Sequence, residues 1–397
     1  MHTARAGYAG EVFWAFLKLG LTSFGGPIAH LGYFREEFVS RRGWFDDRAY
    51  GDLVALCQFL PGPASSQVGF AIGLLRAGPL GAAAAWVGFT LPSAILMLAI
   101  ALGAAALDSA LAVGVLHGLK LVAVAVVAQA VLGMAKSLTP DRERAGIAVL
   151  AVACMVLLGG VFGQVGGILV GALLGLWLCR DDKRAEVAAA DMPVSRAVGF
   201  AALAAFVGLL IVTPLLAGFG QGFALFDAFY RAGALVFGGG HVVLPLLEAG
   251  TVGQGWLSED SFLAGYGAAQ AMPGPLFTFA AYLGAAGTPA PNGALGAAIA
   301  LVAIFLPGLL IVSAALPFWH GLRANPTAQA AMRGANAAVV GILALALYDP
   351  VFKSAVLSPL DFALALAGFV ALVSWKIPPI WVVLALAVAG GAIGVFG

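Results

Sequence analysis

The sequence has very little charge for its length. Only 10% of its 397 residues are Asp, Glu, Lys or Arg, and the mean hydropathy is +1.01, whereas about a quarter of a typical soluble protein is charged. Residues 53–107 contain one charge, Arg76, and residues 264–322 contain none. Such runs exceed the roughly 20 residues that cross a bilayer core, so each must hold several membrane segments. The net charge of +1 gives no reason to expect nucleic acid as a partner.

Cysteine and the common catalytic motifs are also scarce. Cys57, Cys154 and Cys179 are scattered without a CxxC spacing, so the sequence indicates neither a disulfide framework nor a zinc site. We find no HExxH, Walker or dinucleotide-binding pattern. We therefore expect no metal and no cofactor. Residues 1–11 lack a cleavable signal pattern, and insertion is expected to use the first apolar segment.

What the sequence does contain is a Pro-Gly-Pro motif that occurs twice inside apolar runs. Pro61-Gly62-Pro63 and Pro273-Gly274-Pro275 are each preceded by a glutamine at the same offset, Gln58 and Gln270. Proline removes a backbone donor and disfavours helix at the residue before it, so each motif must stop and restart a helix. In lipid, broken backbone is tolerated only where it is buried in protein or lines a wet cavity. The motifs therefore predict two polar positions at membrane depth.

The chain also carries an internal repeat with an offset of about 212 to 216 residues. Residues 13–26 align with residues 226–239 at seven identical positions of fourteen, the two Pro-Gly-Pro motifs coincide, and His117-Gly118 aligns with Arg333-Gly334. Duplicated halves of this length are typical of secondary transporters, in which the repeats enclose the substrate site. We expect an N-terminal repeat over residues 1–180, a linker with a connecting helix over 181–222, and a C-terminal repeat over 223–397.

The predicted fold is an all-α polytopic membrane protein made of two inverted repeats. Each half begins with a glycine-broken segment, then a Pro-Gly-Pro-broken segment, then four helices. The broken segments are expected at 12–34, 50–76, 223–247 and 261–286. The helices are expected near 79–107, 110–136, 145–161, 163–179, 292–317, 327–347, 356–374 and 378–396, with an unmatched helix near 197–218 between the halves.

Two topologies fit this pattern. If the four broken segments are re-entrant, the chain has nine full spans, and sixteen basic residues lie inside against one outside. If every segment crosses, there are thirteen spans, and only twelve basic residues lie inside against five outside. The positive-inside rule favours the first topology, with a cytoplasmic N-terminus. Topologies of ten to thirteen spans are the alternative.

Two basic residues are predicted within the membrane at equivalent repeat positions. Lys18 and Arg231 each precede a Gly-Gly pair by seven residues. A charge at the bilayer centre costs about 2.5–3.5 kcal/mol on insertion scales, so such residues usually face a cavity or a partner. Two symmetric cations suggest an anionic substrate. The alternative is that the long side chains snorkel to the interface.

The restarted helices also favour an anion, because free N–H groups, a positive dipole end and hydroxyl donors gather there. Glycines beside the breaks let the backbone approach a ligand closely, and the glutamines either donate to the ligand or pair with neighbouring helices. His241 is a candidate for a coupling proton, whereas Asp227 and Glu248 are expected to be solvated. Besides Lys18, Arg231 and His241, the predicted substrate-binding residues are Gly25, Gly26, Gln58, Pro61, Gly62, Pro63, Ala64, Ser65, Ser66, Gly238, Gly239, Gly240, Gln270, Pro273, Gly274, Pro275, Leu276 and Thr278.

These motifs resemble the signatures of the chromate ion transporter family in its long, two-domain form. The matching stretches are LTSFGGP at 21–27, RRGW at 41–44, QFLPGPA at 58–64, FGGGH at 237–241 and AMPGP at 271–275. The resemblance implies a bacterial or archaeal inner-membrane protein that exports chromate, confers resistance and is related to sulfate handling. It also implies two halves of opposite topology, with the glycines and prolines of the motifs as functional positions.

We therefore expect a secondary transporter of a tetrahedral oxyanion, working by alternating access. Chromate is the first candidate and sulfate or a related oxyanion the second. A passive anion channel shares the same features, and a membrane-embedded enzyme is the alternative of another class. The expected partners are the oxyanion and the lipid bilayer, and a homodimer is compatible with the sequence.

Overall fold

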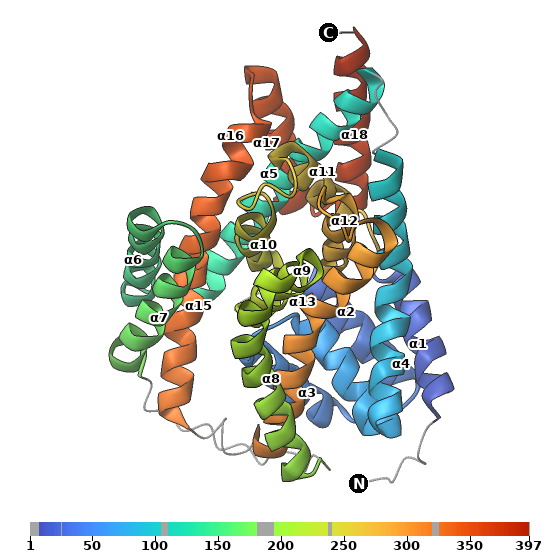
Figure 1. Cartoon of the computed structure of the whole chain (residues 1–397), viewed down its shortest axis with the longest axis vertical. Coiled ribbons are helices and arrows are strands. Elements are labelled where there is room, and N and C mark those ends of the chain that lie inside the picture. The colour runs from blue at the N-terminus through green and yellow to red at the C-terminus, as the bar shows by residue number, and fades with distance from the viewer. Residues whose placement is uncertain are drawn as a thin grey trace.

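The computed structural model describes residues 8–24, 26–104, 110–180, 194–236, 240–319 and 325–396. Within these ranges the chain is helical and forms no strand. Figure 1 shows an elongated bundle, in which the start of α8 lies at one end and helix α18 lies at the other. The predicted all-α fold is confirmed.

The breaks predicted in the first half all interrupt helices. The elements are α1 (Ala9–Thr22), α2 (Gly26–Arg35), the π-helical η1 (Glu36–Arg41), α3 (Asp47–Phe59), α4 (Ala64–Ala104), α5 (Ala110–Leu138), α6 (Arg142–Leu158) and α7 (Gly160–Leu178). Helix α4 is kinked at Ala77 and Gly78, where the backbone leaves helical angles. This kink separates the Pro-Gly-Pro segment from the next predicted helix.

The connecting helix and the second half follow the same order. They comprise α8 (Arg196–Leu216), η2 (Ala217–Phe219), α9 (Gln221–Ala234), η3 (Gly240–Val242), α10 (Val243–Thr251), α11 (Glu259–Ala269), η4 (Leu276–Thr278), α12 (Phe279–Ala286), α13 (Gly293–Ala315), η5 (Leu316–Phe318), α15 (Pro326–Ala346), η6 (Leu347–Phe352), α16 (Lys353–Ala355), α17 (Pro359–Val373) and α18 (Pro379–Phe396). The second Pro-Gly-Pro motif lies between α11 and η4. The helix therefore restarts with a 3₁₀ turn rather than directly.

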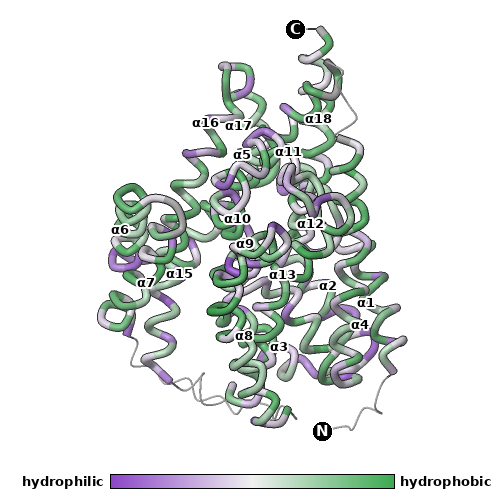
Figure 2. Tube along the Cα trace, in the orientation of Figure 1, coloured by the Kyte–Doolittle hydropathy of each residue, from purple (hydrophilic) through white to green (hydrophobic). Residues whose placement is uncertain are grey.

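The surface has the composition of a membrane protein. Among the described residues, five helices are long and apolar enough to cross a bilayer, and shorter apolar helices accompany them. Large side chains such as Phe162, Leu157 and Trp177 are more than 80% exposed, and hydrophobic residues make up most of the chain trace (green in Figure 2). An exposed apolar surface of this kind is stable in lipid. The chain is an all-α polytopic membrane protein, while nine full spans remain a prediction.

Each half packs its last two helices against the other half. Helices α17 and α18 contact α5, whereas α6 and α7 contact α15 (Figure 1). Small residues allow both crossings: a Cβ on Gly118 would lie 2.1 Å from the Leu386 carbonyl oxygen, and one on Gly334 would lie 2.0 Å from that of Gly171. Gly118 and Gly334 align in the sequence repeat. The two crossings therefore use equivalent glycines.

Candidate functional site

The first Pro-Gly-Pro motif is buried and is bonded to the opposite half of the chain. Helix α3 ends at Phe59 and α4 begins at Ala64, with Gly62 at a φ of +120° between them. The Gly62 N–H donates to the Val236 carbonyl oxygen at 2.7 Å. The side chain of Gln67 donates to the carbonyl oxygens of Pro61 and Gly308, at 2.8 and 3.0 Å. The broken backbone is thus satisfied partly by the second half.

The second motif makes the reverse contact. Gly274 has a φ of +87°, and its N–H donates to the Ser23 carbonyl oxygen at 2.8 Å. A Cβ on Gly274 would lie 3.0 Å from both the Phe89 carbonyl oxygen and Ser93 Oγ. Glycine is therefore required here both for its backbone angle and for space.

These two hydrogen bonds are equivalent under the sequence repeat. Ser23 aligns with Val236, and Gly62 aligns with Gly274. Ser23 and Val236 each lie just after the first helix of their half. Each accepts a hydrogen bond from the Pro-Gly-Pro motif of the other half. Both breaks are bonded to the opposite half, so each of the two predicted polar positions is built from both halves.

The first half places several buried hydroxyl groups just after its first helix and along α4. Ser23 Oγ, Ser66 Oγ and Thr90 Oγ1 are buried and have no hydrogen-bond partner among the described residues. Ser93 Oγ donates to the Thr90 carbonyl oxygen at 3.2 Å. A buried polar atom without a partner carries a desolvation penalty of roughly 1–3 kcal/mol. A ligand with several acceptor oxygens would remove that penalty.

His30 belongs to this group, and the sequence prediction missed it. Its side chain is 1% exposed, its Nδ1 lies 3.4 Å from Ser65 Oγ, and it packs edge-on against Phe89. It also lies against the backbone of Ser23. His30 aligns with Val243 and so has no counterpart in the repeat. A search for polar residues in the apolar stretch after the Gly-Gly pair, without the requirement for duplication, would have found it.

The second half places its candidate residues differently. His241 Nδ1 lies 2.6 Å from the Tyr266 hydroxyl. The Thr278 hydroxyl donates to the Pro275 carbonyl oxygen at 2.8 Å.

Gln58 is exposed, whereas its counterpart Gln270 is partly buried. The remaining motif positions Pro61, Pro63, Ser65, Pro273 and Pro275 lie at the breaks, as do Gly26, Ala64, Gly240 and Leu276, while Gly25, Gly238 and Gly239 lie outside the described residues.

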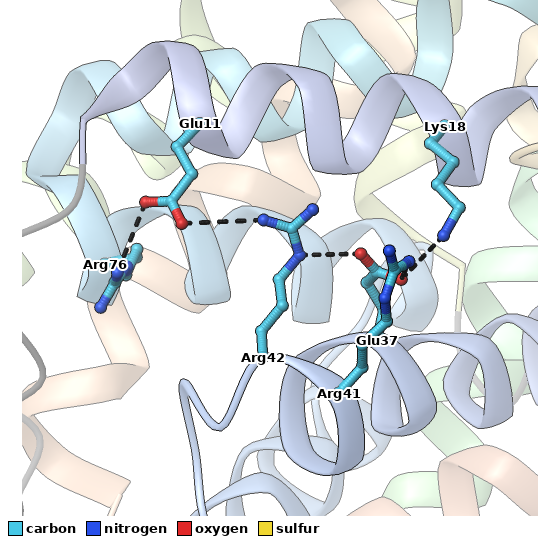
Figure 3. A network of polar contacts seen from close by, with 6 residues as sticks. All are labelled: Glu11, Lys18, Glu37, Arg41, Arg42 and Arg76. Carbon is cyan, nitrogen blue, oxygen red and sulfur yellow. Dashed lines mark hydrogen bonds and ion pairs between the residues drawn. The ribbon is translucent and has the colours of Figure 1, made fainter.

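Lys18 belongs to a network of charges beside the first broken segment (Figure 3). Its Nζ lies 3.0 Å from Glu37 Oε2, and Arg41 and Arg42 also contact the Glu37 carboxylate, at 3.0 and 2.7 Å. Arg42 and Arg76 further contact Glu11, at 3.7 and 3.4 Å. Four cations thus surround two carboxylates, leaving an excess of two positive charges.

Glu37 is the centre of this network. Its side chain is 5% exposed. Burial by itself would raise the pKa of its carboxyl, but the hydrogen bonds from Arg42, Lys18 and Arg41 outweigh burial and lower that pKa to about 2. Glu37 therefore stays ionised and holds the three cations together.

Arg231 is paired inside its own segment. It contacts the carboxylate of Asp227, which also accepts a hydrogen bond from the Thr213 hydroxyl at 2.7 Å. Asp227 is 2% exposed, so the expectation that it is solvated is wrong, because Arg231 and Thr213 replace the water. Lys18 and Arg231 are 49% and 42% exposed and have separate carboxylate partners.

A large cavity lies between the halves at the end of the bundle that holds the C-terminus. Its volume is about 1260 Å³, and its lining includes His117, Lys120, Asp260, Ser261 and Tyr282. Lys120 Nζ lies 2.8 Å from Asp260 Oδ1, and His117 Nε2 lies 2.7 Å from Asp361 Oδ1. Lys120 lies within α5 and faces this cavity. We call this space the vestibule.

Comparison with known sequences gives the same two-part pattern. The sequence model of the family described as "Chromate transporter" matches residues 10–176 and again residues 223–391. The chain belongs to the chromate transporter family. The resemblance read from the motifs is thereby confirmed. Known members of this family are transport proteins, which also confirms the expectation of a transporter rather than an enzyme.

Several curated chromate transporters align with nearly the whole chain. The chromate transport protein of Pseudomonas aeruginosa is 29% identical, covering 96% of this chain and 91% of its own length. A probable chromate transport protein of Synechococcus elongatus is 30% identical, with 94% and 93% covered. The chromate transport protein of Cupriavidus metallidurans is 28% identical, with 86% and 82% covered. No solved structure matches this chain significantly.

Proposed function

We propose that this protein is a secondary transporter that exports chromate, a tetrahedral dianion, across the inner membrane by alternating access and so confers chromate resistance. Family membership supports chromate as the substrate. Sulfate, which has the same shape and charge, is the alternative substrate. The N-terminus would lie in the cytoplasm, and the halves 1–180 and 223–397 would be inverted repeats joined through residues 181–222.

The observation that carries this proposal is the reciprocal pair of hydrogen bonds, Gly62 to Val236 and Gly274 to Ser23. Transporters built from repeats place their substrate between broken helices and move one part against another around that site. A relative movement of the halves would change both bonds at once. The two breaks are therefore suited to form the centre of an alternating-access site.

The surroundings of the breaks suit an oxyanion. The first turn of α4 follows Pro63 and presents Ser65 and Ser66, and Ser23 and Thr90 add buried hydroxyl groups. Hydroxyl and backbone donors at a helix start favour tetrahedral anions. Lys18 and Arg231 would contribute positive charge from the edge of the site, after exchanging part of their contact with Glu37 and Asp227 for the substrate.

The excess positive charge around Glu37 supports export. The network around Glu37 has an excess of two positive charges, and it lies on elements that the nine-span topology places in the cytoplasm. An inside-negative potential also drives a dianion outward, by about 4.6 kcal/mol per 100 mV at roughly 2.3 kcal/mol per charge. Export therefore needs no ATP-binding site.

Counter-flow in proteoliposomes tests the proposed function. Purified protein is reconstituted into vesicles loaded with unlabelled chromate, and the uptake of labelled chromate is followed. A carrier shows saturable uptake that is accelerated by chromate on the opposite side. Currents without saturation would instead indicate a channel, and reduction of the chromate would indicate an enzyme. Sulfate in place of chromate tests the alternative substrate.

The two cations are tested by the Lys18→Gln and Arg231→Gln variants. If they balance the dianion, each substitution raises the KM for chromate, and the double variant raises it further. Lys18 and Arg231 are ion-paired, so their substitution also removes a contact with Glu37 or Asp227. The Glu37→Gln and Asp227→Asn variants break the same contacts but keep the cations. They therefore show how much of the change in KM comes from the lost contact rather than from the lost positive charge. Variants of Lys18 and Arg231 that transport like the parent protein would remove both cations from the proposed site.

A further inference from the structure

The vestibule contains a histidine–carboxylate pair that joins the two halves. His117 belongs to α5 of the first half, and Asp361 lies in the first turn of α17 in the second half. Their Nε2 and Oδ1 atoms are 2.7 Å apart, with the side chains 22% and 8% exposed. Asp361 Oδ2 also accepts hydrogen bonds from the Leu357 N–H at 3.1 Å and the Ser358 hydroxyl at 3.0 Å. Asp361 is therefore fixed, and it holds the imidazole at the cavity wall.

The other charged groups of the vestibule leave it negative. Lys120 is paired with Asp260, whose side chain is 73% exposed. With a neutral His117, the lining carries one cation and one carboxylate, and Asp361, which contacts His117 without lining the cavity, adds a second carboxylate. Tyr282 on α12 contributes a hydroxyl that contacts Ser261 at 2.9 Å. Asp349 and Lys353, from the segment η6–α16 that also packs against α5, pair with each other and are not part of the lining.

This charge differs from that of the equivalent position in the other half. Arg333 aligns with His117, and it lies in a cavity of about 260 Å³ with Arg144, Arg180 and Asp141. That cavity holds three cations and one carboxylate. The vestibule together with Asp361 thus has an excess of one negative charge, whereas its counterpart has an excess of two positive charges.

We propose that His117, held by Asp361, binds a proton from the solution that fills the vestibule, and that this proton is exchanged for the exported oxyanion. This inference rests on the proposed function. Histidine is the side chain that most often carries exchangeable protons in proteins, and Asp361 lies within hydrogen-bond distance of the His117 ring. A proton on His117 cancels the excess negative charge at the vestibule. The dianion is then released into a space that no longer repels it.

The position of the pair connects protonation to movement. Both the His117–Asp361 and Lys120–Asp260 contacts bridge α5 to helices of the other half. A movement of one half against the other must stretch or break them. Since an ionised pair resists separation more than a neutral one, the proton on His117 changes the balance between the conformations. One proton moving inward with each dianion moving outward makes three charges move down the membrane potential.

A pH gradient at fixed potential tests this exchange. Chromate accumulation is measured in proteoliposomes whose potential is clamped with potassium and valinomycin, with both solutions kept alkaline so that chromate remains a dianion. If one proton is exchanged for each anion, a gradient of about one pH unit changes the steady-state chromate ratio about tenfold in the parent protein. In the His117→Gln variant, the steady-state chromate ratio does not respond to the pH gradient.

Two further variants sharpen the test. In Asp361→Asn the response to the pH gradient is weaker than in the parent, because an amide cannot offset the positive charge of a proton on His117. Asp349→Asn is the matched control, since Asp349 is a half-exposed carboxylate paired with Lys353 outside the vestibule lining. It keeps the response of the parent. A parent ratio that ignores the pH gradient, or a His117→Gln ratio that follows it, overturns the inference.

A titration separates this inference from the proposed function. Nitrogen NMR of the histidine-labelled full-length protein follows the resonance that disappears in His117→Gln. We expect its chemical shift to change when the solution is made more acidic. If it titrates while the parent protein moves no chromate, the substrate proposal fails and the proton site stands. If it does not titrate, the proton site is wrong whatever the protein transports.

Discussion

At the scale of single residues, the glycine at the centre of each break is held by two separate constraints. Gly274 has a positive φ and lies against the backbone of α4. We expect Gly274→Ala to destabilise the protein by about 1–2 kcal/mol from the backbone angle alone, and by roughly 1–3 kcal/mol more from crowding. Thermal unfolding in detergent measures the sum, and chromate flux measures the effect on the site.

Gly159 supplies the matched control for this prediction. It has a φ of +69° between α6 and α7, and a Cβ there would meet no atom within 4 Å. Gly159→Ala should therefore show only the cost of the backbone angle and keep the chromate flux. Equal losses in Gly159→Ala and Gly274→Ala would mean that the close approach to Phe89 and Ser93 contributes nothing.

The Glu37 carboxylate gives a prediction about acid stability. Its pKa is about 2 in the folded protein, against 4.5 ordinarily. A lowered pKa stabilises the fold above the ordinary value, and this contribution is lost as the pH falls from 4.5 through about 2. The Glu37→Gln variant should be less stable than the parent at neutral pH, by roughly 1–3 kcal/mol, and should lose less stability on acidification.

Unfolding at several pH values between neutral and strongly acidic checks this expectation. Glu36→Gln is the control, because Glu36 is the exposed neighbour. A Glu37→Gln variant with the acid sensitivity of the parent would show that the network around Glu37 does not stabilise the fold.

Among individual residues, sequence reasoning succeeded where the backbone itself imposes the structure. Proline and glycine fix local geometry, so the breaks at Gly62 and Gly274 could be predicted. Side-chain partners depend on packing between distant segments, and the contacts of Lys18 with Glu37 and of His30 with Ser65 could not. Requiring a residue to be duplicated also hid His30, whose role has no counterpart in the second half.

At the scale of helices, close crossings depend on small residues at particular positions. Gly118 and Gly133 both lie on α5, yet a Cβ on Gly118 would reach the Leu386 carbonyl oxygen at 2.1 Å, whereas a Cβ on Gly133 would meet nothing within 4 Å. We expect Gly118→Ala to lower stability by about 1–3 kcal/mol, because α18 must move away.

Gly133→Ala is the control on the same helix, and it should raise stability by about 0.5–1 kcal/mol because alanine restricts the unfolded chain. Thermal unfolding of both variants in one detergent compares them directly. If the two substitutions have the same effect, the contact between α5 and α18 is loose in solution. The equivalent change Gly334→Ala should behave like Gly118→Ala.

The helix order was predictable because apolar runs and their interruptions have lengths that match a bilayer. The packing of each half's last helices against the other half could not be predicted. It places α17 and α18 on α5, and it depends on which apolar surfaces fit together. A sequence of alanine, glycine, leucine and valine does not specify that choice.

At the scale of the whole molecule, the remaining question is how the chain crosses the membrane. The nine-span and thirteen-span topologies agree on most loops and differ on two, residues 248–260 and the loop that contains Ser40. The nine-span topology places this loop in the cytoplasm, and the thirteen-span topology places it outside. Ser40 is exposed, as is Thr288 in the vestibule, which both topologies place outside.

Cysteine labelling in whole cells distinguishes them. The Ser40→Cys and Thr288→Cys variants are treated with a maleimide that does not cross the membrane, before and after permeabilisation. Cys57 and Cys179 are buried, and Cys154 is replaced to remove background labelling. Thr288→Cys should react in intact cells, whereas Ser40→Cys should react only after permeabilisation. Labelling of Ser40→Cys in intact cells would place the positive network on the outer side, where its excess charge would attract the anion inward, and the proposed direction of transport would have to be reversed.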